Sequence, residues 1–279
     1  MIARFDEKAP RPVPPLEEQD GTTLARLVAV MRRLLADDGC PWDREQSLES
    51  LRKYVLEEAC EVIDAIDSGD REAVREELGD LLLQVVFQAE LLRKEGRFAI
   101  DDVVSGIVEK LVSRHPHVFG DVKADTADEV LTNWEKLKAK EKKGRAILAG
   151  VPRSLPALVR AQRIGEKVSR VGFDWQDSKG SMTKVHEEIG ELEHAISSGD
   201  AKAKEEELGD ALFALVNLAR HLDVDAEGAL RRTIDKFTKR FAHVEERVRE
   251  NHGGWGDTSK DKLPLETLDR YWEEAKARE

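Results

Sequence analysis

The chain contains the segment Leu56-Glu57-Glu58-Ala59-Cys60-Glu61, which is followed by Glu76-Glu77-Leu78-Gly79-Asp80. The same pattern recurs as His186-Glu187-Glu188-Ile189-Gly190-Glu191, followed by Glu206-Glu207-Leu208-Gly209-Asp210. Every acidic position in the second pair lies 130 residues after its counterpart in the first. Because this period is far longer than that of solenoid repeats, it indicates a duplicated domain.

Apolar residues within each copy recur with a helical period. At about 100° per residue, one arc contains Leu51, Val55, Val62 and Ile66. The turn signal Ser68-Gly69-Asp70 follows this helix and has its own copy 130 residues later. Charged residues make up 37% of the chain and aromatic residues 5%, a composition typical of helical proteins. We therefore predict an all-α fold with two tandem copies of a small helical bundle.

The repeat divides the chain into four predicted segments. Residues 1–20 combine several prolines with charges and are predicted to form a disordered tail. The N-terminal copy is assigned to residues 21–143 and the C-terminal copy to residues 157–279. Residues 144–156 contain two glycines and two prolines, which favours a linker.

Bulk properties exclude several classes of function. The formal net charge of −12 repels a nucleic-acid polymer. The N-terminus lacks the apolar region of a signal peptide, and the most apolar stretch, residues 81–92, is interrupted by Gln84, Gln88 and Glu90. We expect a cytoplasmic protein that binds neither polymeric nucleic acid nor a membrane.

Four carboxylates of each copy lie at the border of the apolar stripes on two successive helices. Acidic residues at helical spacing usually form a solvated face. Crowded beside apolar residues, however, they would raise one another's pKa unless a cation lay among them. Oxygen-only ligands fit Mg²⁺ when water and phosphates complete its octahedron. The predicted ligands are Glu58, Glu61, Glu77 and Asp80 in the first copy, and Glu188, Glu191, Glu207 and Asp210 in the second.

Two alternatives remain open from these residues. A di-iron carboxylate bundle uses Glu-x-x-His pairs on facing helices, and Glu191 with His194 has that spacing. The position matching His194 in the first copy is Asp64, so the iron set is incomplete. The other alternative is a non-catalytic helical module whose acidic faces bind a partner protein.

Basic and aromatic residues also recur in the same order after the acidic segments. Their repetition favours neutralisation of phosphate by the basic side chains, while each tryptophan is either a core anchor or a surface that stacks on a nucleobase. The pairs are Lys110 and Arg114 with Lys236 and Arg240, and Trp134 and Lys138 with Trp272 and Lys276.

Together with Cys40-Pro-Trp-Asp43, Arg114-His-Pro-His-Val-Phe119 and Val171-Gly-Phe-Asp-Trp175, these motifs resemble the tandem-domain MazG-type nucleoside triphosphate pyrophosphohydrolases. The resemblance implies the all-α NTP pyrophosphatase fold and a homodimer with interlocked helices. It implies hydrolysis of a broad range of (d)NTPs, ATP included, to the monophosphate and pyrophosphate, and a role in nucleotide-pool sanitation. Mg²⁺ is the expected cofactor, with Mn²⁺ able to replace it.

The resemblance also assigns roles to residues. Glu188, Glu191, Glu207 and Asp210 would bind the metal. As a mechanistic hypothesis of our own, Glu187 or Glu188 is the general base. The resemblance places the nucleotide against Lys184, Glu187, Glu206, Lys236, Arg240, Trp272 and Lys276. The same hypothesis has Lys236 and Arg240 stabilise the departing pyrophosphate. In the first copy Tyr54 stands where the second has Lys184, although Lys53 is adjacent, and this departure leaves catalysis by the first copy open.

Overall fold

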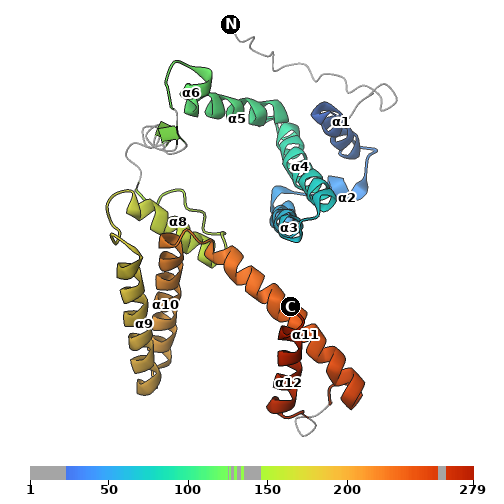
Figure 1. Cartoon of the computed structure of the whole chain (residues 1–279). Coiled ribbons are helices and arrows are strands. Elements are labelled where there is room, and N and C mark those ends of the chain that lie inside the picture. Colours follow the sequence, from blue (N-terminus) through green and yellow to red (C-terminus); the bar gives the residue numbers. More distant parts are fainter. Residues whose placement is uncertain (1–22, 125, 127–128, 131–132, 135–145, 257–261) are drawn as a thin grey trace. The chain divides into compact units, whose positions relative to one another are not determined.

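The elements of the fold are helices, and no strand occurs in the part of the chain that the computed structural model describes. That part comprises residues 23–124, 126, 129–130, 133–134, 146–256 and 262–279. The predicted tail, the first two linker residues and Lys138 lie outside it. The chain divides between residues 143 and 144 into two units (Figure 1), and the predicted all-α fold with tandem copies is confirmed.

The N-terminal unit is built around a hairpin of two long helices, α3 and α4 (Figure 1). Its described helices are α1 (Leu24–Leu34), α2 (Pro41–Arg44), α3 (Leu48–Ser68), α4 (Arg71–Lys94), α5 (Ile100–Arg114) and α6 (Pro116–Phe119). Helix α1 packs against α4, and α3 and α4 pack against each other along their length.

Local sequence signals set the turn of this hairpin. Ser47 caps the start of α3 by accepting a hydrogen bond from the Ser50 amide. Gly69 ends α3 in the left-handed region at φ 77°, where an L side chain would be strained. The Asp70 carboxylate then accepts from the amides of Glu72 and Ala73 and starts α4. Two residues thus reverse the chain and place α4 beside α3.

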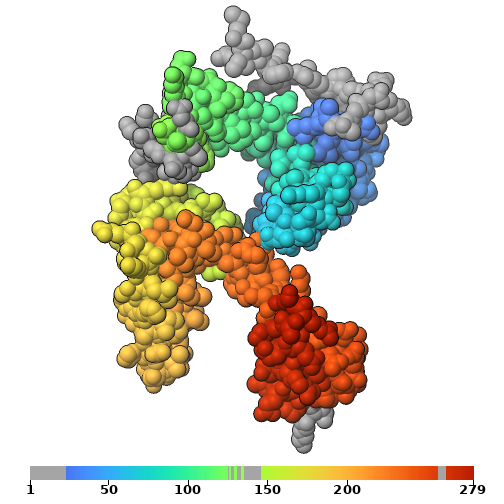
Figure 2. Space-filling model, viewed as in Figure 1, coloured from blue at the N-terminus to red at the C-terminus, as the bar shows by residue number. Residues whose placement is uncertain are grey.

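The C-terminal unit repeats this hairpin. Its described helices are α8 (Ala157–Ser169), α9 (Ser178–Ser198), α10 (Ala201–His221), α11 (Ala226–His252) and α12 (Leu265–Lys276). Gly199, at φ 79°, ends α9 and Asp200 caps α10, so the turn chemistry is also duplicated. Helices α9–α10 and α11–α12 form two separate arms in the view of Figure 2.

The core of the N-terminal unit lies at one side of the α3–α4 hairpin. Leu51, Val86 and Phe87 are buried there with residues of α1. The predicted apolar arc is only partly buried, because Leu51 is 1% exposed whereas Ile66, at the far end of α3, is 55% exposed. A two-helix hairpin covers one side of each helix, so Ile66 is left exposed among the described residues of the unit.

Two smaller clusters form the core of the C-terminal unit. Val185, Ala214 and Leu218 are buried between α9 and α10, and Val244, Val248 and Tyr271 between α11 and α12. None of the helices in the described ranges is both long enough and apolar enough to cross a membrane.

Matching positions of the two hairpins carry ion pairs in which the acid and the base exchange places. On α4 the fully buried Glu90 accepts two hydrogen bonds from Arg32 of α1, at 3.0 and 3.1 Å. On α10 the residue 130 positions later is Arg220, which binds Asp174 in the segment between α8 and α9. The acid is on the hairpin in one unit and the base is on the hairpin in the other.

Candidate metal and nucleotide site

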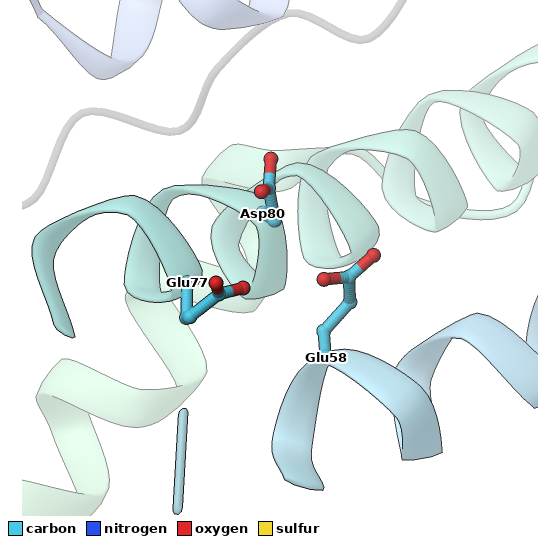
Figure 3. A group of neighbouring side chains, drawn as sticks. All are labelled: Glu58, Glu77 and Asp80. Carbon is cyan, nitrogen blue, oxygen red and sulfur yellow. The ribbon is translucent and has the colours of Figure 1, made fainter. Parts of the chain in front are cut away.

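The α3–α4 hairpin brings three of the predicted metal ligands together. Glu58 extends from α3 toward Glu77 and Asp80 on α4 (Figure 3), and one carboxylate oxygen of each lies within 4.8 Å of the others. Glu77 and Asp80 share a face of α4 because residues three apart lie on the same side of a helix. The three oxygens therefore surround a space that a small cation can occupy.

The electrostatics of this group reflect its crowding. Burial raises the pKa of Glu58 above its usual range, and repulsion from Asp80 and Glu61 raises it further. The pKa of Glu77 is also raised, by burial and by the neighbouring Glu61 and Asp80. The predicted ligand Glu61 thus lies close enough to act on both residues, although it is outside the set of oxygens within 4.8 Å.

The α9–α10 hairpin forms the equivalent group in the C-terminal unit. Glu188, Glu207 and Asp210 also offer oxygens within 4.8 Å of one another. Burial raises the pKa of Glu191, and its neighbours Glu188 and Glu207 raise it further. Four predicted ligands therefore interact here, with Glu191 at the edge of the three-residue group.

A lysine distinguishes the C-terminal group. Lys184 lies one turn before Glu188 on α9, with its Nζ 2.5 Å from Glu188 Oε1 and 2.7 Å from Glu187 Oε1. Hydrogen bonds to these two carboxylates raise the pKa of Lys184. Glu188 is only 5% exposed, so its charge is compensated by this ammonium group.

The N-terminal group has no lysine at the matching position. The ring of Tyr54 contacts Trp42 edge-on at 6.1 Å and lies under the Lys53 ammonium. Tyr54 also packs against the core of its unit. Its position on α3 is therefore used for aromatic packing.

Both three-residue groups consist of carboxylates alone. Hard cations such as Mg²⁺ prefer oxygen ligands, whereas zinc and iron sites in proteins commonly include His or Cys. His194 is exposed and its Nδ1 lies 2.8 Å from the Gly190 carbonyl oxygen of its own helix. The donor sets fit Mg²⁺, and the di-iron alternative lacks its histidine in the described part of both groups.

The predicted nucleotide contacts on α11 and α12 form a second cluster. Arg240 binds Glu279 and lies over the Trp272 ring at 5.6 Å. Trp272 also contacts Phe237 at 4.9 Å and packs on the core between these helices, while Lys276 binds Glu273. Lys236 is exposed on the same arm. The structure thus groups these residues on the α11–α12 arm and the carboxylates on the α9–α10 arm.

The remaining predicted positions are Glu206 on α10 and the basic and aromatic residues of the N-terminal unit. Glu206 is exposed, with Lys202 one turn earlier at 3.5 Å. In the N-terminal unit the guanidinium of Arg114 lies 5.9 Å from the centre of the Trp134 ring, which repeats the pairing of Arg240 with Trp272. The recurring order of basic and aromatic residues therefore corresponds to a recurring contact.

Comparison with known proteins agrees with this duplicated arrangement. The profile of the MazG nucleotide pyrophosphohydrolase domain matches residues 46–119 and again residues 176–245, so each match includes one acidic group. The chain is 44% identical over 261 residues to the nucleoside triphosphate pyrophosphohydrolase/pyrophosphatase MazG of Thermotoga maritima, covering 93% of this chain and 98% of that protein. It is 45% identical over 260 residues to the nucleoside triphosphate pyrophosphohydrolase of Escherichia coli K12, covering 91% and 97% of the two chains.

This chain belongs to the MazG family. Membership confirms the resemblance and the enzyme class that it implied. Each of the two MazG domains contains one acidic hairpin, and the second domain also has Lys184 beside its acidic group.

One aromatic feature of the second MazG domain was not predicted. Phe237 and Phe241 stack at 6.0 Å on α11, and Phe241 stacks on Trp255 at 5.9 Å, so with Trp272 they form a row of four rings. Phe237 is 56% exposed. The spacing of four residues between the two phenylalanines is the signal from which their contact could have been predicted.

Proposed function

We propose that the protein is a Mg²⁺-dependent nucleoside triphosphate pyrophosphohydrolase that converts a broad range of (d)NTPs to the monophosphate and pyrophosphate. The grouping of Glu188, Glu207 and Asp210 on facing helices carries this proposal. The two relatives, both named as nucleoside triphosphate pyrophosphohydrolases, support the activity. The proposal extends to a cytoplasmic role in nucleotide-pool sanitation and to Mn²⁺ as a replacement for Mg²⁺.

Glu188, Glu191, Glu207 and Asp210 would hold the metal ion. When bound, it neutralises charge on the phosphates and lowers the pKa of a bound water. In the reaction the water oxygen bonds to phosphorus at the α/β linkage, the bond to the departing pyrophosphate breaks, and a proton of the water passes to a carboxylate. Glu187 is the more suitable base, because it is exposed whereas Glu188 is buried among the ligands.

Lys184 has two roles in this proposal. Without a nucleotide, its ammonium compensates Glu187 and Glu188. The phosphate oxygens of a triphosphate carry more negative charge than the carboxylates. The ammonium group of Lys184 therefore binds the phosphates when the nucleotide is present and leaves Glu187 and Glu188 free. Binding of the substrate is thereby coupled to the release of the base.

A homodimer is part of the proposal. Apolar side chains on the outer faces of α9 and α10 are 40–58% exposed, which is unusual for a patch of this extent on a monomer. A second copy packed on these faces would bury them and bring its own α11–α12 arm to the acidic group. The residues are Ile189, Ile196, Leu208, Leu212, Phe213 and Leu215, and Leu82 on α4 matches Leu212.

The activity is tested by release of pyrophosphate. Each (d)NTP is incubated with the protein with and without Mg²⁺, and phosphate is measured after coupled pyrophosphatase. We expect turnover only with Mg²⁺, a loss of at least about 100-fold in Glu191→Gln with unchanged helix content, and a smaller loss in the matched first-copy variant Glu61→Gln. Full activity in Glu191→Gln refutes the site, and no release from any NTP refutes the enzyme.

The shared site is tested by complementation. Glu207→Gln and Arg240→Ala should each be inactive, since each removes one part of the site. If two copies share a site, mixed dimers of these variants regain one intact site, and activity returns to about a quarter of wild type on random mixing. Sedimentation of Leu212→Glu should show a monomer. No recovery on mixing contradicts sharing between copies.

A further inference from the structure

The two acidic groups differ in a residue that no motif draws attention to. On α4, Glu77, Asp80 and Gln84 are spaced three and four apart and share one face, opposite Glu58 of α3. On α10 the same face carries Glu207, Asp210 and Ala214. An amide therefore lies next to the N-terminal group at a position where the C-terminal group has a methyl.

Gln84 is buried in an unusual way for a polar side chain. It is 7% exposed, and its Nε2 donates to Glu58 Oε1 across the hairpin at 3.5 Å, near the upper limit for a hydrogen bond. In the part of the chain that the structure describes, its buried Oε1 has no hydrogen-bond partner. A buried amide oxygen without a partner costs free energy, and such atoms commonly mark a missing water or ion.

The C-terminal counterpart has a different environment. Ala214 packs with Val185 and Leu218 in an apolar cluster, and the charge of Glu188 is met by Lys184. The N-terminal group has Gln84 at the position of Ala214 and Tyr54 at the position of Lys184. Its three carboxylates therefore have a neutral amide beside them in place of a methyl group, and no ammonium group at the position of Lys184.

We propose that Gln84 is a fourth oxygen donor of the N-terminal divalent-cation site and that it allows this site to bind a cation without a nucleotide. The inference rests on the cation sites of the proposed function. An amide oxygen is a suitable ligand for a hard cation and adds no charge. With a cation or its bound water beside Oε1, the unpartnered atom acquires its missing contact, and Glu58 is oriented by Nε2.

The test separates the two sites in the full-length protein. One background keeps only the N-terminal group through Glu207→Gln with Asp210→Asn, and the control background keeps only the C-terminal group through Glu77→Gln with Asp80→Asn. Free Mn²⁺ is measured by electron paramagnetic resonance during titration without nucleotide. Gln84→Met, which preserves the volume of the side chain, should raise the Mn²⁺ Kd about 10-fold in the first background and leave it within about twofold in the second.

A second variant guards against a folding defect. Gln84→Glu retains an oxygen at this position, so its Mn²⁺ Kd in the first background should equal or fall below that of Gln84. Circular dichroism reports helix content throughout. An unchanged Kd in Gln84→Met, or a Kd in Gln84→Glu as weak as that of Gln84→Met, overturns the role of Gln84.

The result also distinguishes this inference from the proposed function. If the first background binds no Mn²⁺ at all, both the N-terminal cation site and the role of Gln84 are refuted. Pyrophosphate release by the wild-type protein is measured separately and is unaffected by that outcome. If Mn²⁺ binds the first background equally well with and without Gln84→Met, the cation site is supported and only the role of Gln84 as a fourth donor is refuted.

Discussion

Neutralising one ligand of the C-terminal group should stabilise the metal-free protein while it removes the activity. Glu207 has a carboxylate oxygen within 4.8 Å of those of Glu188 and Asp210. Two unit charges at that separation repel by about 1 kcal/mol in water and by about 3.5 kcal/mol at the effective dielectric constant of a protein surface. Asp210 is exposed and Lys184 already offsets Glu188, which favours the lower value.

We therefore expect Glu207→Gln to raise the free energy of unfolding of the C-terminal unit by about 1 kcal/mol, or its Tm by about 3–5 °C. The assay is differential scanning calorimetry at low salt with EDTA. Glu205→Gln is the matched control, because it removes the same charge from an exposed position on the same helix. Adding Mg²⁺ should stabilise the wild type and narrow the difference.

One result would refute this reasoning. If Glu207→Gln in EDTA melts no higher than Glu205→Gln, the carboxylates do not repel one another in the folded state. The hairpin would then lack the crowding that makes it a candidate cation site.

Three further changes have expected outcomes. Arg32→Ala removes the two hydrogen bonds that Arg32 donates to the buried Glu90 and leaves the one from Arg93, so it should destabilise the N-terminal unit by about 1–2 kcal/mol in urea unfolding, whereas no measurable loss would contradict this estimate. The pKa values of Glu58 and Glu77 are raised in the folded state, so the metal-free N-terminal unit should become more stable as the pH falls through these pKa values toward about 4.3, the value in an unfolded chain. Mg²⁺ should bind more weakly at that pH. A Glu77→Gln variant whose stability depends on pH as that of the wild type does would disprove this prediction. Lys184→Met should raise the KM for NTP about 10-fold, because the phosphates lose their ammonium partner, and steady-state kinetics showing an unchanged KM would rule out that contact.

Most of the helical hairpins could be predicted from the sequence, because local chemistry determines them. Gly69 and Asp70 form a turn on their own, and their copies at Gly199 and Asp200 form the same turn. The three-residue spacing of Glu77 and Asp80 likewise fixes their common face whatever the rest of the chain does. Local signals of this kind do not depend on distant contacts.

Other features depend on contacts between distant residues, which no local pattern reveals. The helical period of α3 predicts that Ile66 is buried, yet burial requires a covering neighbour, and the described residues of the unit leave Ile66 exposed. The sequence indicates a phosphate-binding role for Arg240, but its ion pair with Glu279 depends on how α12 returns along α11. In the sequence Gln84 is only an interruption of an apolar stretch, because its contact with Glu58 depends on the packing of α3 against α4.

In the two ion pairs the acid and the base exchange places, and this bears on how the helices of a duplicated chain find their own unit during folding. Helix α1 docks on α4 through Arg32 and Glu90, and α10 presents Arg220 at the corresponding place. If α1 docked on α10, the guanidinium groups of Arg32 and Arg220 would meet in a partly buried contact, which is unfavourable because the two charges are alike. Two duplicated domains can therefore fold on the same polypeptide without exchanging their helices.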